Sequence, residues 1–330
     1  MGRNLINVDK KYFCDEVIDD FLVTERVKRA LMSELEVLVR FEKICNDLGI
    51  TYYASWGTLL GAIRHGGFIP WDDDIDIFMM RKDYNILKEY AQKGPLPDGL
   101  LMIDDTMVNN FNNLTARVVN GDSIVISQEY LKMYHGCPYV TGLDIDVLDK
   151  KAPNRADDEL QTMLIDSVLK LALYFRAHDD MMTESGQSFT SEEDVLDTIK
   201  AVENACGVKV NRNENLFLQM HILKDKLSQM YENTPSDTLQ VLGVRVAKNL
   251  NAAQFKTDLF SQSLRIPFGP VSINVPIGYH EILKQMYGND YLIPANRKAA
   301  HDYPFFLVQE PTLEELLESI GMTRKDLGIA

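Results

Sequence analysis

Residues 67–79 read GFIPWDDDIDIFM and place several aspartates within a run of apolar residues that is typical of a buried β-strand. The aspartates are Asp72, Asp73, Asp74 and Asp76. Successive side chains of a strand point to opposite faces, so Asp72, Asp74 and Asp76 share one face if strand geometry begins that early. Ile75 and Ile77 then point the other way and can enter a core. The alternation predicts a strand with one acidic and one apolar face.

Carboxylates crowded on one face of a strand need a counter-charge. Two unit charges about 4 Å apart repel each other by roughly 4 kcal/mol at an effective dielectric near 20. Either one carboxyl group has a raised pKa, or a divalent cation binds between them. A site made only of oxygens suits Mg²⁺ or Mn²⁺, and Mg²⁺ commonly binds substrate phosphates as well. The alternative is an acidic surface turn that precedes a strand.

Two further features favour a ligand site over an acidic surface turn. Residues 142–149 read GLDIDVLD, which predicts a second strand with Asp144 and Asp146 on one face. Gly57 and Thr58 begin a short predicted helix, whose first backbone N–H groups are able to receive a phosphate. The sequence therefore predicts a phosphate-bearing substrate for this site.

The remaining patterns predict an α+β (α/β) enzyme core with helical additions. A helix is expected over residues 24–48, with Thr24 as its N-cap and Gly49 at its end. Residues 264–276 predict a hairpin that turns at Gly269 and Pro270. Further strands are expected at 50–56, 74–79, 100–103, 114–119, 123–127 and 143–148, and further helices at 58–65, 82–93, 278–290 and over most of 155–235.

These patterns divide the chain into four parts. Residues 1–49 form an N-terminal helical segment, and residues 50–154 form the catalytic core. Residues 155–260 are mainly helical, and residues 261–330 add a hairpin and helices that complete the core.

Composition excludes several classes of protein. The chain has 330 residues and a net charge of −15, which argues against a general nucleic-acid binder and against electrostatic docking on an anionic membrane. Its four cysteines form no CxxC pair, so a zinc or thioredoxin-type motif is not expected. The N-terminus lacks the apolar region of a signal peptide, and no long apolar run predicts a transmembrane helix. We therefore expect a cytoplasmic protein without a transmembrane segment.

Residues 56–77, WGTLLGAIRHGGFIPWDDDIDI, resemble the signature of the LicD family. This family includes bacterial phosphocholine transferases, has the fukutin-related ribitol-phosphate transferases as distant relatives, and belongs to the nucleotidyltransferase superfamily. The resemblance continues over residues 115–120, 143–149 and 275–294. It implies a nucleotidyltransferase-like mixed β-sheet core flanked by helices, with helical insertions.

The resemblance also implies roles for the acidic residues. Asp74 and Asp76 would form a metal-binding pair, and Asp144 would be the third carboxylate. Asp146 and Val147 stand where the family usually has Phe and Pro, so Asp146 is an alternative to Asp144 as the residue that faces the metal. The metal would be Mg²⁺ or Mn²⁺.

The same comparison assigns residues to substrate binding and proton transfer. Gly57 and Thr58 match the position that holds nucleotide phosphates, and Thr58 retains the hydroxyl group of the usual Ser. An aspartate beside the metal would accept the proton of the acceptor hydroxyl. Asp72 is the first candidate for this base, followed by Asp146.

The reaction so implied transfers a phospho-alcohol group, with phosphocholine preferred, from a CDP-activated donor. The acceptor would be a hydroxyl of a cell-surface glycan or teichoic-acid-like polymer, and CMP would be released. A glycolipid acceptor would bring the protein close to a membrane. The alternatives are a nucleotidyltransferase that moves NMP to an acceptor, and a non-catalytic protein that binds a nucleotide or another ligand.

Several cationic residues are candidates for contact with the donor. Arg64 and His65 are interpreted as a clamp on the diphosphate, or alternatively as basic residues that complement the dipole of a helix C-terminus. Arg117, on a predicted strand, requires an anion, either Asp74 and Asp76 or the donor phosphate. His301 and the nearby Arg297 lie where the family often has a basic tail, which would reach the substrate.

Two tryptophans flank the acidic run in the sequence. Trp56 and Trp71 are each interpreted as a core residue, or alternatively as a ring that stacks on cytosine or encloses a quaternary ammonium group.

Overall fold

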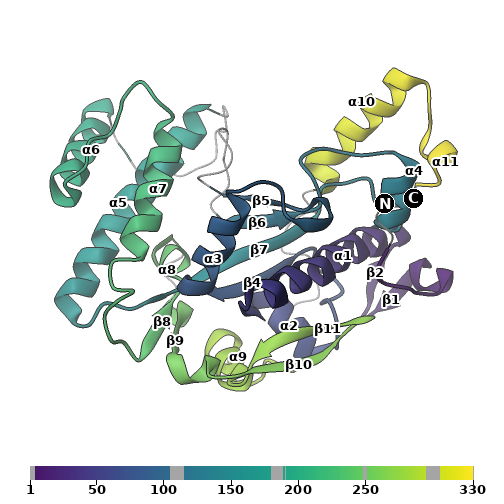
Figure 1. Cartoon of the computed structure of the whole chain (residues 1–330), viewed down its shortest axis with the longest axis horizontal. Helices are drawn as coiled ribbons and strands as arrows, with labels where there is room; N and C mark the ends of the chain where they lie inside the picture. Colours follow the sequence, from purple (N-terminus) through teal and green to yellow (C-terminus); the bar gives the residue numbers. More distant parts are fainter. Residues whose placement is uncertain are drawn as a thin grey trace. The chain divides into compact units, whose positions relative to one another are not determined.

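The computed structural model describes residues 4–104, 115–179, 189, 191–247, 251–294 and 305–329 (Figure 1). The chain forms two compact units. The first consists of Met1–Met102, Arg117–Asp146 and Ser261–Ala330, and the second of Ile103–Ala116 and Val147–Phe260.

The first unit contains the long helix α1 (Glu25–Leu48), which begins and ends where the sequence predicts. The Thr24 hydroxyl accepts a hydrogen bond from the Val27 N–H, and Gly49 adopts a left-handed conformation with φ 66°. Every residue from Ala30 to Leu38 is buried, so this stretch of the helix is covered on all sides. The helix also buries five polar residues, which are Lys28, Ser33, Glu34, Glu36 and Arg40.

The central sheet of the first unit has the strand order β3-β4-β7-β6-β5. Its strands are β3 (Tyr52–Ala54), β4 (Ile75–Met80), β7 (Gly142–Lys150), β6 (Ala116–Val119) and β5 (Leu101–Ile103). The first two pair antiparallel, with Tyr53 opposite Phe78. Together with its helices, this sheet confirms the predicted α+β class.

One predicted strand is wrong. Residues 123–127 form no strand, although the Val125 N–H donates to the Pro138 carbonyl oxygen at 3.1 Å. Ile124 and Ile126 instead pack, partly buried, against the cluster that contains Cys137 and Tyr139. The β-branched residues of this stretch therefore serve side-chain packing and not a ladder of backbone hydrogen bonds.

The strand that carries Asp76 begins later in the chain than the alternation of acidic and apolar residues from Asp72 predicts. β4 starts at Ile75, and the Asp72 N–H donates to the Ile69 carbonyl oxygen at 2.9 Å, which closes a turn. The condition for a shared face, that strand geometry begins as early as Asp72, is therefore not met. Asp76 lies on the strand, whereas Asp74 lies directly before it.

A short helix and a hairpin flank the sheet in the first unit. α2 (Trp56–Arg64) follows β3, and α3 (Arg81–Ala91) follows β4. The predicted hairpin is confirmed as β10 (Ser263–Phe268) and β11 (Val271–Pro276), with Gly269 at φ 58° in its turn. The Gly269 N–H donates to the Gly66 carbonyl oxygen at 2.6 Å, which joins this turn to the loop after α2.

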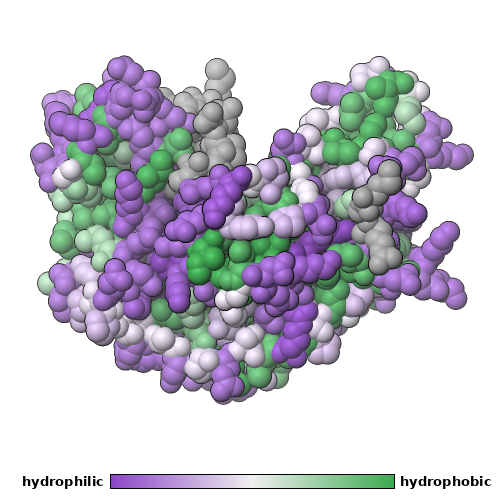
Figure 2. All heavy atoms as spheres, in the orientation of Figure 1, coloured by the Kyte–Doolittle hydropathy of each residue, from purple (hydrophilic) through white to green (hydrophobic). Residues whose placement is uncertain are grey.

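Smaller elements complete the first unit. They are the 3₁₀ helix Lys10–Phe13, β1 (Glu16–Ile18), β2 (Phe21–Val23), the 3₁₀ helix Pro97–Gly99, α4 (Gln128–Met133), α9 (Tyr279–Tyr287), a π-helical turn at Phe305–Gln309, α10 (Glu310–Ile320) and α11 (Arg324–Leu327). Leu313 and Leu317 of α10 pack in a buried cluster with Ala30. Figure 2 also shows apolar side chains on the outer surface around α10, where Leu307, Val308 and Ile320 are exposed.

The second unit is mainly helical, as predicted for residues 155–235. Its elements are α5 (Arg155–Asp179), α6 (Glu192–Cys206), α7 (Leu216–Ser228), β8 (Thr238–Gln240), α8 (Leu242–Ala247), the 3₁₀ helices Asn251–Ala253 and Thr257–Phe260, and β9 (Gln254–Lys256). Ile165, Val168 and Met220 belong to its buried core. Arg245 binds both carboxylate oxygens of Asp158 at 2.7 Å, which fixes α8 against α5.

Across the parts of the chain that the structure describes, no helix combines the length and the apolar character needed to span a membrane.

We predict that Gly142→Ala lowers the free energy of unfolding by about 1–3 kcal/mol, because overpacking forces neighbouring groups apart. A Cβ atom at Gly142 would lie 2.2 Å from the Val118 carbonyl oxygen and 2.8 Å from the Val119 Cγ1. Urea unfolding followed by circular dichroism measures this change.

The matched control is Gly243→Ala in α8, where a Cβ atom would meet nothing within 4 Å. This substitution should raise stability by about 0.5–1 kcal/mol, since alanine favours a helix over glycine. Equal effects of the two substitutions would contradict the steric explanation.

Candidate active site

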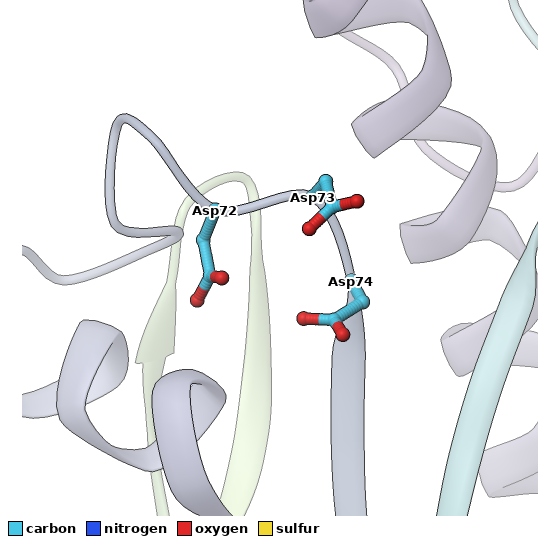
Figure 3. A group of neighbouring side chains, drawn as sticks. All are labelled: Asp72, Asp73 and Asp74. Carbon is cyan, nitrogen blue, oxygen red and sulfur yellow. The ribbon is translucent and has the colours of Figure 1, made fainter. Parts of the chain in front are cut away.

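Three consecutive carboxylates lie together where the chain enters β4. One carboxylate oxygen from each of Asp72, Asp73 and Asp74 lies within 4.8 Å of the others (Figure 3). Asp73 is 8% exposed, whereas its two neighbours are half-buried. Figure 3 shows the Asp74 side chain directed back toward Asp72. Within the described ranges, this is the one group of three potential metal-ligating side chains that lie so close together.

Asp76 is the point on which acidic residues of the loop before β4 and of β7 converge. Burial raises the pKa of Asp76 well above its ordinary value, and the negative charges of neighbouring carboxylates raise it further. In decreasing order of effect, these neighbours are Asp74, Asp146, Asp144 and Asp72. Both acidic strands predicted from the sequence therefore contribute to one cluster, and all of its members lie in the first unit.

The two aspartates of β7 each have a fixed partner. Asp144 Oδ1 accepts a hydrogen bond from Arg117 Nε at 2.5 Å, in a half-buried ion pair. Asp146 Oδ2 accepts one from the indole N–H of Trp56. The anion that Arg117 requires is thus Asp144, not Asp74 or Asp76, and contact between Arg117 and a donor phosphate stays a prediction.

The start of α2 is joined to the start of β4 by two hydrogen bonds. The Asp76 N–H donates to Thr58 Oγ1 at 2.8 Å, and the Ser55 N–H donates to the Asp76 carbonyl oxygen at 3.0 Å. The Thr58 side chain is buried, and its hydroxyl therefore serves the backbone of β4. Ser55, the N-cap of α2, has a buried hydroxyl oxygen without a hydrogen-bond partner among the residues that the structure describes.

Gly57 allows an acidic side chain to lie against the first turn of α2. A Cβ atom at this position would lie 2.4 Å from Asp72 Oδ2, which is closer than real Cβ contacts allow. The Asp72 carboxylate thus approaches the helix end where the dipole favours negative charge. Any larger residue at Gly57 would displace that carboxylate.

Trp56 has an unusual backbone conformation at the edge of the cluster. Its φ of 39° lies in the left-handed region, which is uncommon for a residue with a side chain. The indole ring packs edge-to-face on Phe78, with centroids 5.3 Å apart, while its N–H holds Asp146. Trp71 packs instead between Phe21 and His65, at centroid distances of 6.2 and 6.1 Å.

Arg64 and His65, at the end of α2, have contacts of different kinds. Arg64 Nη1 donates to the Tyr291 carbonyl oxygen at 3.3 Å. Burial lowers the pKa of Arg64, while the charges of Tyr287, Asp19 and Asp72 oppose this shift. His65 Nε2 lies 3.2 Å from Asp19 Oδ2, and burial, followed by the charge of Arg64, lowers the pKa of His65. Their action as a clamp on the diphosphate stays a prediction.

His301 and Arg297 lie outside the described residues, so their predicted contact with the substrate stays a prediction as well.

The sequence analysis missed two residues that face the cluster. Glu34 of α1 is 4% exposed, and burial raises its pKa well above the ordinary value. The charges of Asp74 and Asp73 raise this pKa further. A signal for Glu34 was available, because it lies three residues after Leu31 and four before Leu38, on the apolar face of the helix.

Tyr287, at the end of α9, is the second missed residue. The residue as a whole is 43% exposed, but desolvation of the phenol raises its pKa. The charges of Asp72 and Asp76 raise this pKa further, while the charge of Arg64 opposes them. Tyr287 belongs to the stretch 275–294 that carries the family resemblance, but nothing local in the sequence connects it to the aspartates.

Strand-borne carboxylates beside the first turn of a short helix are typical of nucleotidyltransferase-type sites, and comparison with known proteins agrees. Residues 49–135 match the family described as "LicD/FKTN/FKRP, nucleotidyltransferase domain". This match confirms, for residues 49–135, the resemblance to the LicD family drawn from residues 56–77.

Several named proteins match part of this chain. The lipopolysaccharide cholinephosphotransferase LicD of Haemophilus influenzae is 54% identical over 50 residues, which cover 15% of this chain and 19% of that protein. The ribitol-5-phosphate transferase FKTN of Mus musculus is 31% identical over 106 residues, or 31% of this chain and 23% of that protein. Mannosyltransferase regulator 4 of Saccharomyces cerevisiae is 24% identical over 253 residues, which cover 66% of this chain and 21% of that protein. The chain thus spans about a fifth of the length of these relatives.

We predict that Thr58→Val lowers the free energy of unfolding by about 1–3 kcal/mol, because it leaves the Asp76 N–H without its acceptor in a buried place. Valine has nearly the shape of threonine, so the change isolates the hydroxyl group. Urea unfolding measures the loss, and Thr58→Ser, which keeps the acceptor, should restore most of it. A Thr58→Val variant as stable as the wild type would show that this hydrogen bond is dispensable.

The raised pKa of Asp76 predicts a pH dependence in the absence of divalent cations. The folded chain keeps a proton that the unfolded chain releases above about pH 4, so this group lowers stability as the pH rises. Asp76→Asn removes the effect, and its stability relative to the wild type should therefore be greater at pH 8 than at pH 5.

Urea unfolding in EDTA at the two pH values tests this expectation. Asp122→Asn, at an exposed position, is the control and should show the same difference from the wild type at both. An equal effect of Asp76→Asn at pH 5 and pH 8 would contradict the expectation.

Proposed function

We propose that this chain transfers a phospho-alcohol group, phosphocholine, from a CDP-activated donor to a hydroxyl of a cell-surface glycan or teichoic-acid-like acceptor, with release of CMP. The observation that carries the proposal is the convergence of carboxylates from the loop before β4 and from β7 on Asp76, beside the first turn of α2. This arrangement lies in and around the part of the chain that matches the LicD family. The names of two relatives, a cholinephosphotransferase and a ribitol-5-phosphate transferase, support the reaction class.

The donor set of the cluster fits Mg²⁺ or Mn²⁺. Every candidate ligand is a carboxylate, without imidazole or thiolate, and hard divalent cations prefer such oxygens. Asp74, Asp76 and Asp144 are the proposed ligands, and Arg117 holds Asp144 in place. When bound, the cation supplies positive charge that stabilises the transferring phosphoryl group and the departing CMP.

Residues of the chain bind the donor and accept the proton of the acceptor hydroxyl. The N–H groups at the start of α2, around Gly57 and Thr58, bind a phosphate of the donor. Arg64 and His65 are the proposed clamp on the diphosphate. The acceptor oxygen forms a bond to the β-phosphorus, and the bond from that phosphorus to the oxygen of CMP breaks. Asp72, which lies against Gly57, is the proposed base that takes the proton of the acceptor hydroxyl.

A second candidate uses the same site for transfer of NMP to an acceptor. The family description, which names a nucleotidyltransferase domain, favours this alternative. Products separate the two, because phosphocholine transfer releases free CMP, whereas nucleotidyl transfer leaves CMP on the acceptor. A non-catalytic ligand-binding protein would leave a CDP-alcohol donor intact.

We predict that the chain consumes CDP-choline in the presence of Mg²⁺ and an acceptor glycan, and that EDTA abolishes the turnover. Asp74→Asn and Asp76→Asn should each lower kcat by about 10²–10³-fold, which is the scale of losing one electrostatic contribution to the transition state. Chromatography of the nucleotide products measures the rate.

The control is Glu42→Gln, a residue of α1 that pairs with Arg265 and should leave the rate unchanged. Full metal-independent turnover in a variant that carries both Asp74→Asn and Asp76→Asn would overturn the proposed function.

A further inference from the structure

Glu34 has a buried carboxylate oxygen that lacks a hydrogen-bond partner. Its Oε2 is inaccessible to solvent and receives no hydrogen bond from any residue that the structure describes. The residue is 4% exposed. Leaving a buried acceptor unpaired costs about 1–3 kcal/mol, and more when the group is charged. A donor for this oxygen is therefore expected from outside the described residues, and a bound water is a suitable one.

Glu36, the other buried glutamate of α1, lies two residues further along the helix and therefore on a different side of it, and it shows what a satisfied carboxylate looks like. Glu36 is fully buried, and it accepts hydrogen bonds from the backbone N–H groups of Leu5 and Ile6 at 2.8 and 2.9 Å. It also interacts with Arg40 and with His135. These contacts hold the pKa of Glu36 below its ordinary value, although burial alone would raise it.

Glu34 instead faces the aspartates of the candidate active site. Its strongest charge interaction is with Asp74, followed by Asp73, Arg117 and Asp144. Of these neighbours only Arg117 is cationic, and its Nε already donates to Asp144. Glu34 thus adds a further carboxyl group to an acidic cluster without adding a counter-charge.

The spacing indicates how Glu34 would act on a cation. The carboxylates of Asp72, Asp73 and Asp74 have oxygens within 4.8 Å of one another, and Glu34 is not part of that group. Asp74 belongs to this group and is also a proposed ligand of the cation, so a cation bound at Asp74 would reach Glu34 through water. Mg²⁺ usually keeps several of its waters, and each such water is a strong hydrogen-bond donor.

We propose that Glu34 is a positioning residue of the cation site, and that its Oε2 accepts a hydrogen bond from a water bound to a divalent cation held by the aspartates. The inference rests on the cation of the proposed function, but it does not depend on which group is transferred. A water bound to the cation would supply the missing partner of Glu34 Oε2, and the hydrogen bond would connect α1 to the cation site. Loss of a partner in the outer shell of a metal typically lowers metal affinity about 10–100-fold.

Binding of Mn²⁺ to the full chain without substrate, measured by electron paramagnetic resonance, tests the inference. Glu34→Met keeps the unbranched length of the side chain and removes both the charge and the acceptor, so its Mn²⁺ affinity should be about 10–100-fold lower than that of the wild type. Glu34→Gln keeps an acceptor oxygen and should lie between the two. Glu42→Gln, on the same helix, should bind Mn²⁺ as the wild type does.

Thermal unfolding distinguishes this role from a merely structural one. In EDTA, Glu34→Met should unfold at the same temperature as the wild type or higher, because it removes an unpaired buried carboxyl group. Addition of Mg²⁺ should raise the Tm of the wild type more than that of the variant, since binding stabilises in proportion to affinity. An equal loss of Tm with and without Mg²⁺ would indicate a structural role and overturn the inference.

The outcomes separate this inference from the proposed function. Unchanged Mn²⁺ affinity in Glu34→Met, together with lost binding in Asp74→Asn, would overturn the role of Glu34 alone. Absence of Mn²⁺ binding in the wild type would overturn the cation of the proposed function and this inference with it. If Glu34→Met does not fold, the Mn²⁺ titration of Glu34→Gln tests the inference instead. A Glu34→Gln variant that binds Mn²⁺ with the affinity of the wild type would overturn it.

Discussion

Repulsion among buried and half-buried carboxylates is the constraint on which the first unit depends. Asp76 lies where the charges of the loop before β4 and of β7 meet, and Glu34 adds a carboxyl group from α1. The protein offsets part of this repulsion with Arg117 and with the indole N–H of Trp56. The repulsion that remains raises the pKa values of Asp76 and Glu34. A divalent cation would relieve this repulsion, and its binding is favourable for that reason.

The backbone around the cluster holds these charges together in spite of their repulsion. Two hydrogen bonds join the start of α2 to Asp76 and so hold the helix end against the acidic strand. Close approach also requires the absence of side chains. At Gly57 the Asp72 carboxylate occupies the place of a Cβ atom, and at Gly142 a carbonyl oxygen of β6 does so. Bringing like charges together in this way lowers the stability of the folded chain.

Local signals in the sequence were sufficient for the elements whose stabilising contacts lie within the element. The helix over 24–48 has its cap at Thr24 and its stop at Gly49, and the hairpin over 264–276 has its turn at Gly269. The predicted strand at 123–127 failed because its apolar residues pack on a cluster formed by distant parts of the chain. The alternation of acidic and apolar residues likewise begins at Asp72, although β4 itself begins only at Ile75, because Asp72 is part of a turn with Ile69.

The sequence by itself determined the acidic strands, the helix that begins at Gly57 and Thr58, and the family, because these depend on residues close together in the chain. Only the tertiary structure decided that Arg117 pairs with Asp144, that Trp56 holds Asp146, and that Glu34 faces the aspartates. Trp56 and Asp146 are 90 positions apart, and no local periodicity relates such residues. Their contact arises because the order of strands in the sheet brings β4 beside β7, and burial then makes each charge sensitive to its neighbours.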